Sequence, residues 1–239
     1  MTGDANVPFS TTKGNHDNDV YSTHELISKW EQKHFPRHSY TQIAPPGVGS
    51  GSGPGEAGTG SDNYWLPIYA RAPDAVHNER PALLLWFLDS RSGKTTLAFN
   101  NTEVDDWIHP SVGTWIEAEV KRMQKDWSGA MPPSLIFTHV PPHASAASQQ
   151  DAPYAPLVGG VSNETSANFT SEGRRYPGLN DDYGFQGQAA EGDRTYAGQD
   201  LVAINALLGG SAGKARIHGI VSGHQHGNDW VSRRMRSVW

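Results

Sequence analysis

The sequence predicts a layered α/β fold in which helices cover the faces of a sheet. Short apolar runs typical of strands alternate with segments whose apolar residues have helical spacing, and polar clusters stand directly after the strand-like runs. The predicted order is strand, helix, strands, helix, strand, long loop, helix and strand. A length of 239 residues suits one domain, so we expect residues 1–239 to form a single unit.

The first predicted elements are a short extended run and a helix. Residues 7–12 are expected to be extended, and they lead into the sequence GNHD at residues 14–17. The sequence STHE at residues 22–25 has the form of a capping box, which predicts a helix over residues 22–34. The apolar residues that follow at helical spacing are Leu26, Ile27 and Trp30.

Strands are predicted in the middle of the chain, after a Gly/Ser-rich loop at residues 47–60. Residues 64–70 have the pattern of a strand. The continuous apolar run at residues 82–88 is typical of a strand that is buried on both faces. This run stops at Asp89, and residues 95–99 are expected to pair with it as a hairpin.

A second helix is predicted from a cap at Ser111 through Trp127, because one apolar stripe runs along this segment. Two prolines then separate the helix from a strand at residues 134–138. The remaining expected elements are a functional loop over the site at residues 141–198, a helix at residues 200–208 and a strand at residues 215–222.

Three short polar clusters carry the chemistry of the chain. They are GNHD at residues 14–17, FTHV at residues 137–140 and GHQH at residues 223–226. Each follows an apolar, strand-like run, and open α/β sheets bind ligands at the carboxyl ends of their strands. We therefore expect the three clusters to meet at one edge of the sheet.

The side chains of these clusters are ligands for first-row metal ions. Asn15 offers a neutral carbonyl oxygen, and His139, His224 and His226 offer imidazoles, which together suit Zn, Mn or Fe. We expect Asn15, His139 and His224 to share one metal ion, with their polar atoms within about 5 Å of one another. His226 is expected to lie one ion–ion distance further on.

Two features of the clusters leave alternatives open. On an extended segment His224 and His226 would share a face, whereas on a turn they could bind two different ions. His16 precedes Asp17, which could fix its tautomer or keep it protonated. A cationic His16 beside a metal pair could stabilise charge on a phosphoryl oxygen or protonate a leaving alkoxide.

The ordered set of GNHD, a strand that ends in His139, and GHQH resembles the last three motifs of the calcineurin-like metallophosphoesterases. Residues 18–21 (NDVY), 88–91 (LDSR) and 227–230 (GNDW) resemble a mainly fungal branch related to the purple acid phosphatases. The resemblance runs from about residue 7 to residue 230. It implies an α/β fold of four layers, αββα, which is a β-sandwich flanked by helices.

The resemblance also implies a function, namely hydrolysis of phosphate esters at a dinuclear site of divalent or trivalent Mn, Zn or Fe ions. The substrate would be a small phosphate ester or a phosphoprotein. In this family the catalytic histidine matches His16, and its partner matches Asp17. The implied metal ligands are Asn15, His139 and His224 for the second ion and His226 for the first ion.

The chain departs from the family pattern at its start. No DxH motif precedes residue 14, and GDANV at residues 3–7 lacks the second carboxylate of GDxxD. We therefore expect a truncated member with an incomplete sandwich. The alternative function is a catalytically inactive or fragmentary phosphoesterase-like protein without the carboxylates of the first metal. Asp89 is expected to be structural, although Asp4 and Asp89 are the first residues to test as replacements.

Composition excludes several other classes of protein. A net charge of −6 disfavours a nucleic-acid-binding surface, and no apolar stretch is long enough to span a membrane. The absence of cysteine excludes disulfides, thiolate metal sites and a cysteine nucleophile. Sequons at Asn100, Asn163 and Asn168 predict a glycoprotein that is secreted or vacuolar in its complete form.

The other histidines have no comparable setting in the sequence. His24 and His218, among others, are expected to be ordinary packing or surface residues. His143 follows two prolines just after His139, so it either lines the site or is solvated, and solvation is the commoner state of a loop histidine.

Overall fold

The computed structural model describes residues 7–19, 22–49, 58–70, 79–95, 102–129, 131–145, 184–188, 196–208 and 216–226. Several features expected from the sequence lie outside these residues: Asp4, the three sequons, most of the loop at 141–198 and the GNDW sequence at 227–230. The described residues form a mixed α/β structure, as the sequence predicts.

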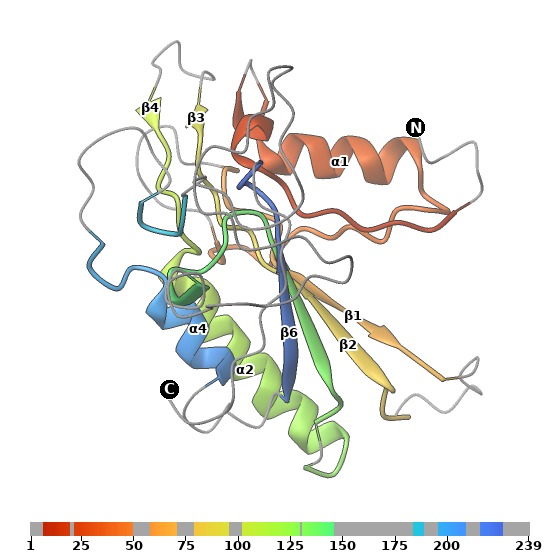
Figure 1. Ribbon diagram of the computed structural model, residues 1–239. Coiled ribbons are helices and arrows are strands. Elements are labelled where there is room, and N and C mark those ends of the chain that lie inside the picture. The colour runs from red at the N-terminus through yellow and green to blue at the C-terminus, as the bar shows by residue number, and fades with distance from the viewer. Residues whose placement is uncertain are drawn as a thin grey trace, which may run out of the picture.

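A four-stranded mixed sheet is the centre of the fold (Figure 1). Its strands lie in the order β1-β2-β5-β6. Strands β2, β5 and β6 run parallel, and β1 is antiparallel to β2. Because three neighbouring strands are parallel, their carboxyl ends meet at one edge, as a site built from strand ends requires. The strand bounds are β1 (Tyr64–Ile68), β2 (Leu83–Phe87), β5 (Ser134–Thr138) and β6 (Ile217–Ser222).

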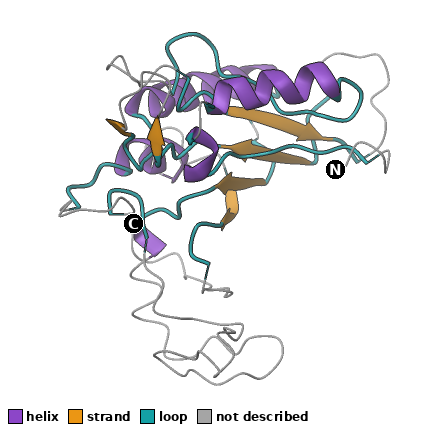
Figure 2. Ribbon diagram, turned by 90° about the horizontal axis from the view of Figure 1, so that it is seen from above, coloured by secondary structure: helices purple, strands orange, loops and turns teal. Residues whose placement is uncertain are grey.

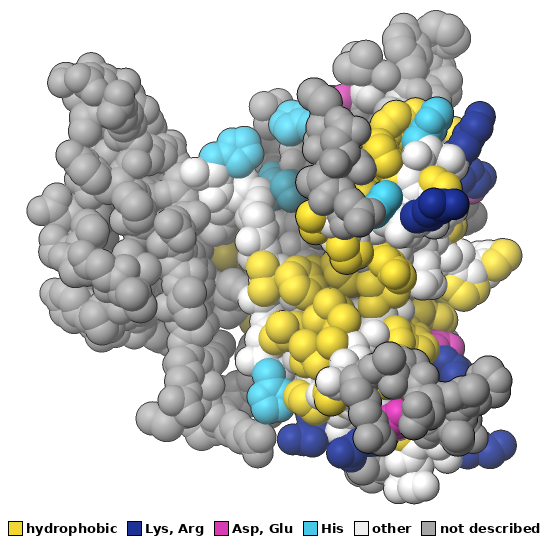
Figure 3. Space-filling view, turned by 90° about the vertical axis from the view of Figure 1, so that its right-hand side faces the viewer, with side chains coloured by type: hydrophobic (Ala, Val, Ile, Leu, Met, Phe, Trp, Pro, Cys, Tyr) yellow, Lys and Arg dark blue, Asp and Glu magenta, His cyan; other side chains and the backbone are white. Residues whose placement is uncertain are grey.

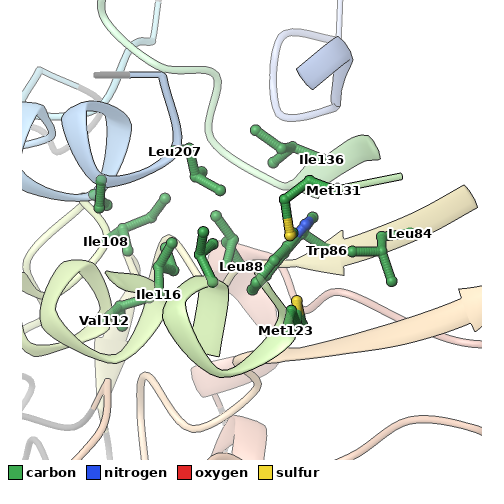
Figure 4. Packing of buried hydrophobic residues seen from close by; sticks show 13 residues of the cluster. Leu84, Trp86, Leu88, Ile108, Val112, Ile116, Met123, Met131, Ile136 and Leu207 are labelled. Atoms are coloured by element: carbon green, nitrogen blue, oxygen red, sulfur yellow. The ribbon is translucent and has the colours of Figure 1, made fainter. Parts of the chain in front are cut away.

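Helices α2 (Pro110–Asp126) and α4 (Leu201–Leu208) lie side by side and cover one face of this sheet (Figure 1). The apolar core fills the space between these two helices and the sheet. Figure 4 shows Trp86 of β2 gathered with Ile116 and Met123 of α2, and all three side chains are fully buried. The predicted apolar stripe of α2 is therefore the face that packs on the sheet, with Trp115 and Trp127 at its margin.

The start of α2 differs from the sequence prediction. His109 is the N-cap, and its Nδ1 accepts a hydrogen bond from the backbone N–H of Ser111. Pro110 occupies the first helical position, where its missing N–H costs no helical hydrogen bond. Ser111, the cap predicted from the sequence, is instead the second residue of the helix.

The predicted hairpin on β2 is wrong. Lys94–Thr95 forms β3, which pairs with β4 (Thr102–Glu103) in a separate two-stranded sheet. The physical reason is that both edges of β2 are already occupied, by β1 on one side and β5 on the other. The expected burial of β2 on both faces is also only partly present, because Leu83 and Leu85 are only half-buried.

Helix α1 (His24–His34) buries a polar face, which the sequence pattern did not suggest. Thr23 caps it by accepting the N–H of Leu26, so the cap lies one residue after the predicted Ser22. The buried positions are His24, Ser28 and Glu31, at i, i+4 and i+7. Leu26 and Trp30 are instead about half exposed, at 48% and 53%. Figure 1 shows α1 set apart from the pair α2 and α4, and Figure 2 shows the helices and strands seen from above.

The second face of the main sheet is apolar. Alternation along the strands places Leu66, Leu85 and Phe137 on the face opposite α2 and α4, and Val221 lies beside Phe137. Val221 is 50% exposed. Figure 3 shows hydrophobic side chains gathered on the corresponding side of the molecule.

The expected four-layer sandwich is not established by the described residues, which show one four-stranded sheet and the small β3–β4 sheet. The extended run at residues 7–12 forms no strand there; its one bridge pairs Phe9 in parallel with Ser39. Among the helices of the described segments, none has the length and apolar character needed to cross a membrane.

Candidate metal centre

Three separate loops deliver the candidate ligands to one edge of the sheet. His139 directly follows β5, and His224 follows β6 after one glycine. Asn15 opens the short 3-10 helix η2 (Asn15–Asn18). The backbone N–H of Gly223 donates to the carbonyl oxygen of His139 at 3.0 Å, so the two strand-end loops are tied together.

The three side chains converge, as expected from the sequence. Asn15 Oδ1 lies 2.9 Å from His139 Nε2 and 3.3 Å from His224 Nδ1. The two ring nitrogens, His139 Nε2 and His224 Nδ1, are themselves 3.3 Å apart. The rings are nearly perpendicular, at 79°, so each directs one nitrogen toward the same point rather than stacking on its neighbour.

The backbone around the cluster is shaped for close approach. His224 has φ of 65°, a left-handed conformation that costs a non-glycine residue about 1–3 kcal/mol and is concentrated at functional sites. A Cβ on Gly14 would lie 2.8 Å from His139 Cε1, so only glycine lets the loop touch the imidazole. Gly93, at φ of 84°, packs against the Asn15 carbonyl, where a Cβ would meet the oxygen at 1.9 Å.

Electrostatics keep His139 neutral. Burial, together with the neighbouring His224, lowers the pKa of His139 to about 4, whereas Asp17 partly opposes the shift. A histidine binds a metal ion through a deprotonated ring nitrogen, so a neutral His139 is already in its ligating form at neutral pH.

The donor set fits a single first-row metal ion. Metal–ligand bonds of about 2.1 Å place neighbouring donors about 3.0–3.4 Å apart in octahedral or tetrahedral geometry. The three separations of 2.9, 3.3 and 3.3 Å match that spacing. The same positions also suit a plain hydrogen bond in which His139 Nε2–H donates to Asn15 Oδ1, so the geometry serves both states.

His16 has a different partner from the one predicted. Its Nδ1 lies 2.7 Å from Asp19 Oδ2, and its side chain is 77% exposed. The carboxylate of Asp17 instead turns back and accepts the backbone N–H of Gly14 at 2.7 Å. The tight 3-10 turn brings residues three positions apart close together, so the Asp19 carboxylate reaches the His16 ring and the Asp17 carboxylate reaches the backbone of Gly14. His226 is exposed, one residue after the buried Gln225.

Carboxylates do not complete the site within the described residues, where no group of three or more His, Cys, Asp and Glu side chains is placed to hold a metal ion. Asp89, proposed as a possible replacement, is fully buried and accepts from His24 Nδ1 at 2.6 Å. Asp62 is also buried, and it pairs with Lys13 and Ser28. These two carboxylates belong to the interior under α1.

Two further histidines, His24 and His143, have partners that the sequence pattern did not predict. His24 was assigned to ordinary packing, yet its Nε2 contacts the carbonyl oxygen of Gly14, one residue before Asn15. The signal for it was the i, i+4, i+7 stripe of His24, Ser28 and Glu31 in a helix with apolar residues elsewhere. His143 stacks on Tyr196 with ring centroids 3.5 Å apart, a packing role outside the cluster.

Comparison of the chain with protein families, with curated proteins and with solved structures finds no match. The geometry of the cluster and the motifs therefore carry the functional argument.

Proposed function

We propose that this chain is a calcineurin-like metallophosphoesterase domain, and that Asn15, His139 and His224 bind one of its two metal ions. The observation that carries the proposal is the convergence of one amide oxygen and two imidazole nitrogens, at 2.9–3.3 Å, from loops up to 209 residues apart. His226, which follows the cluster on an exposed turn, is the proposed ligand of the other ion. A bound metal ion supplies Lewis-acid activation of a phosphate ester.

The chain's own residues have distinct parts in this function. His139 is held neutral and needs no proton release before it binds. His16 is exposed beside Asn15, and Asp19 accepts from its Nδ1, which orients the ring. An exposed, oriented imidazole at that position suits contact with a phosphoryl oxygen or a leaving group. The contact with His16 supports Asp19 for this orienting part, whereas the carboxylate of Asp17 accepts the backbone N–H of Gly14.

A second candidate is a protein that binds a metal ion at this cluster without catalysis. The observation in its favour is that the donors Asn15, His139 and His224 are all neutral, while the buried carboxylates Asp62 and Asp89 pair elsewhere. Neutral donors leave the charge of a dication poorly balanced, so such a site would bind weakly.

Metal binding and hydrolysis, measured on the same preparations, separate the candidates. Zn and Mn binding are followed by equilibrium dialysis, and turnover by hydrolysis of p-nitrophenyl phosphate. The variants are His139→Ala and His224→Ala, with His218→Ala as the matched control, because His218 is an exposed histidine on β6.

A phosphoesterase is expected to show metal-dependent turnover that falls about a hundredfold or more in His139→Ala but not in His218→Ala. Metal binding that depends on His139 and His224 without turnover would favour the non-catalytic candidate. Equal metal binding by all four proteins would refute the metal site itself.

A further inference from the structure

His24 lies between the candidate metal centre and the interior of the protein. Its side chain is fully buried at the first position of α1. Nδ1 lies 2.6 Å from Asp89 Oδ2, and Nε2 lies 3.0 Å from the carbonyl oxygen of Gly14. One ring therefore connects the end of β2 to the residue that precedes Asn15.

The partners of His24 determine its protonation state. A carboxylate and a backbone carbonyl can only accept hydrogen bonds, so both ring nitrogens must carry a proton and the ring is an imidazolium. Burial opposes this charge, but the charge and hydrogen bond of Asp89, together with Asp62, outweigh burial and raise the pKa of His24. A neutral ring could satisfy only one of the two contacts.

The far end of this connection is firmly held. Asp89 Oδ1 accepts the backbone N–H of Arg91 at 2.8 Å, and Oδ2 also accepts the N–H of Asp62 at 3.2 Å. The N–H of Asp89 donates to Asn63 Oδ1 at 3.0 Å. Asp89 follows β2, the neighbour of the strand that delivers His139, so it is fixed to the same sheet edge as that ligand.

Gly14 is consequently held from two sides. His24 binds its carbonyl oxygen, and the His139 ring lies against its α-carbon so closely that a Cβ would be 2.8 Å from Cε1. The distance between Asn15 and His139 thus depends on where His24 holds the Gly14 peptide.

We propose that His24 is a positioning residue for the metal centre: by bridging Asp89 and the Gly14 carbonyl, it sets Asn15 Oδ1 against His139 Nε2. This inference rests on the proposed function for its consequence in metal binding. The placement of the Asn15 loop against His139 can be measured without any metal.

Two amide variants separate the two contacts of the ring. The amide nitrogen of His24→Gln can take the place of Nε2 and still reach the Gly14 carbonyl, whereas that of His24→Asn takes the place of Nδ1 and reaches only Asp89. Ser28→Ala is the matched control, because Ser28 is buried one turn along the same face and donates to Asp62 at 2.5 Å without contacting Gly14.

Removing the support of a metal ligand typically weakens metal binding by about 10–100-fold. His24→Asn should therefore bind zinc about tenfold or more weakly than the wild type, and His24→Gln should recover most of that loss. Ser28→Ala should bind as the wild type does, even where urea denaturation shows it to be less stable. A loss of affinity that follows stability across all three variants would overturn the positioning role.

Nuclear magnetic resonance tests the placement of the Asn15 loop against His139 in the metal-free protein. This measurement therefore remains informative even if the proposed function is wrong. The wild type should show an Overhauser contact between Gly14 Hα and His139 Hε1, lost in His24→Asn and kept in His24→Gln and Ser28→Ala. If His24→Asn does not fold, the protonation of the two ring nitrogens of His24 in the wild type tests the bridge instead. Both should carry protons at pH 7, and one bare nitrogen would overturn the bridge.

Discussion

At the scale of single residues, the centre depends on contacts that leave no room for a larger side chain. Asn15, His139 and His224 meet at hydrogen-bond distance, and the backbone beside them is held by glycines at positions 14 and 93. Gly14 has an ordinary backbone conformation, with φ of −102°, so its lack of a side chain matters for space alone. Its substitution therefore tests the geometry directly.

Gly14→Ala should displace the His139 ring, because the new methyl group would lie 2.8 Å from Cε1 and 2.9 Å from Nε2. We expect zinc affinity, measured by equilibrium dialysis, to fall about tenfold or more, with a loss of about 1–3 kcal/mol in the free energy of unfolding. The control is Gly219→Ala in β6, whose Cβ would meet only the Leu135 side chain, at 3.3 Å. Unchanged zinc affinity in Gly14→Ala would show that the loop does not position the ligands.

At the scale of elements, α1 inverts the usual arrangement of a surface helix. Its buried stripe of His24, Ser28 and Glu31 faces a polar interior that contains Lys13, Asp62 and Asp89. Buried charges of this kind are costly unless paired, and here each has a partner within 3.4 Å. The helix thus packs through a charged network rather than through apolar contacts, and this network reaches the loop of Asn15.

This network predicts how stability depends on pH. The His24 pKa is raised above 6.5, so its contribution to stability is full below pH 6.5 and is lost as the pH rises through the folded-state pKa. Burial also raises the pKa of Asp62 from 3.8 to about 6, so the contribution of Asp62 to stability falls as the pH rises through that range. The pKa of His139 is lowered to about 4, so the contribution of His139 increases as the pH rises from 4 to 6.5. Above pH 6.5 the contributions of Asp62 and His139 no longer change with pH, whereas that of His24 still falls.

Urea denaturation from pH 6.5 to 9 should therefore show the wild type losing stability relative to His24→Gln as the pH rises. The difference between the two proteins should narrow toward high pH, because the neutral wild-type ring can no longer bridge two acceptors. Parallel pH profiles for the two proteins would contradict a charged His24.

The elements show how far the sequence could predict this fold. The strand at residues 134–138 matches β5, and the helices and the strand before GHQH lie within a few residues of their predicted bounds. Apolar periodicity reports on burial against an apolar core, so it identified the stripe of α2. It supported the prediction of α1 as a helix but not its buried face, because that face is polar, and it did not predict the pairing of β3 with β4.

The candidate site was predictable where chemistry depends on residue type and strand position. Asn15, His139 and His224 were placed together because each follows a strand-like run. The predicted partner of His16, Asp17, was wrong, because the choice between Asp17 and Asp19 depends on the turn of η2. His24 was missed because a single buried histidine is defined by its long-range partners, here Asp89 at 65 positions along the chain.

At the scale of the whole molecule, the centre lies at one edge of a sheet that is covered on one face by α2 and α4 (Figure 1). The opposite face is apolar, and among the described residues β6 is the outer strand of the sheet, with Ile220 and Val221 at 37% and 50% exposure. Exposed strand edges and apolar surface favour association. Binding measurements on this protein accordingly need dilute samples and a check of oligomeric state.

The metal centre requires that Asn15, His139 and His224 bind one metal ion together. X-ray absorption spectroscopy of the protein loaded with one equivalent of zinc can show this, since imidazole ligands at about 2.0–2.1 Å give a distinct scattering pattern. We expect two imidazoles and further oxygen ligands in the wild type and in His218→Ala, and one imidazole in His139→Ala. An identical spectrum from the wild type and His139→Ala would contradict it.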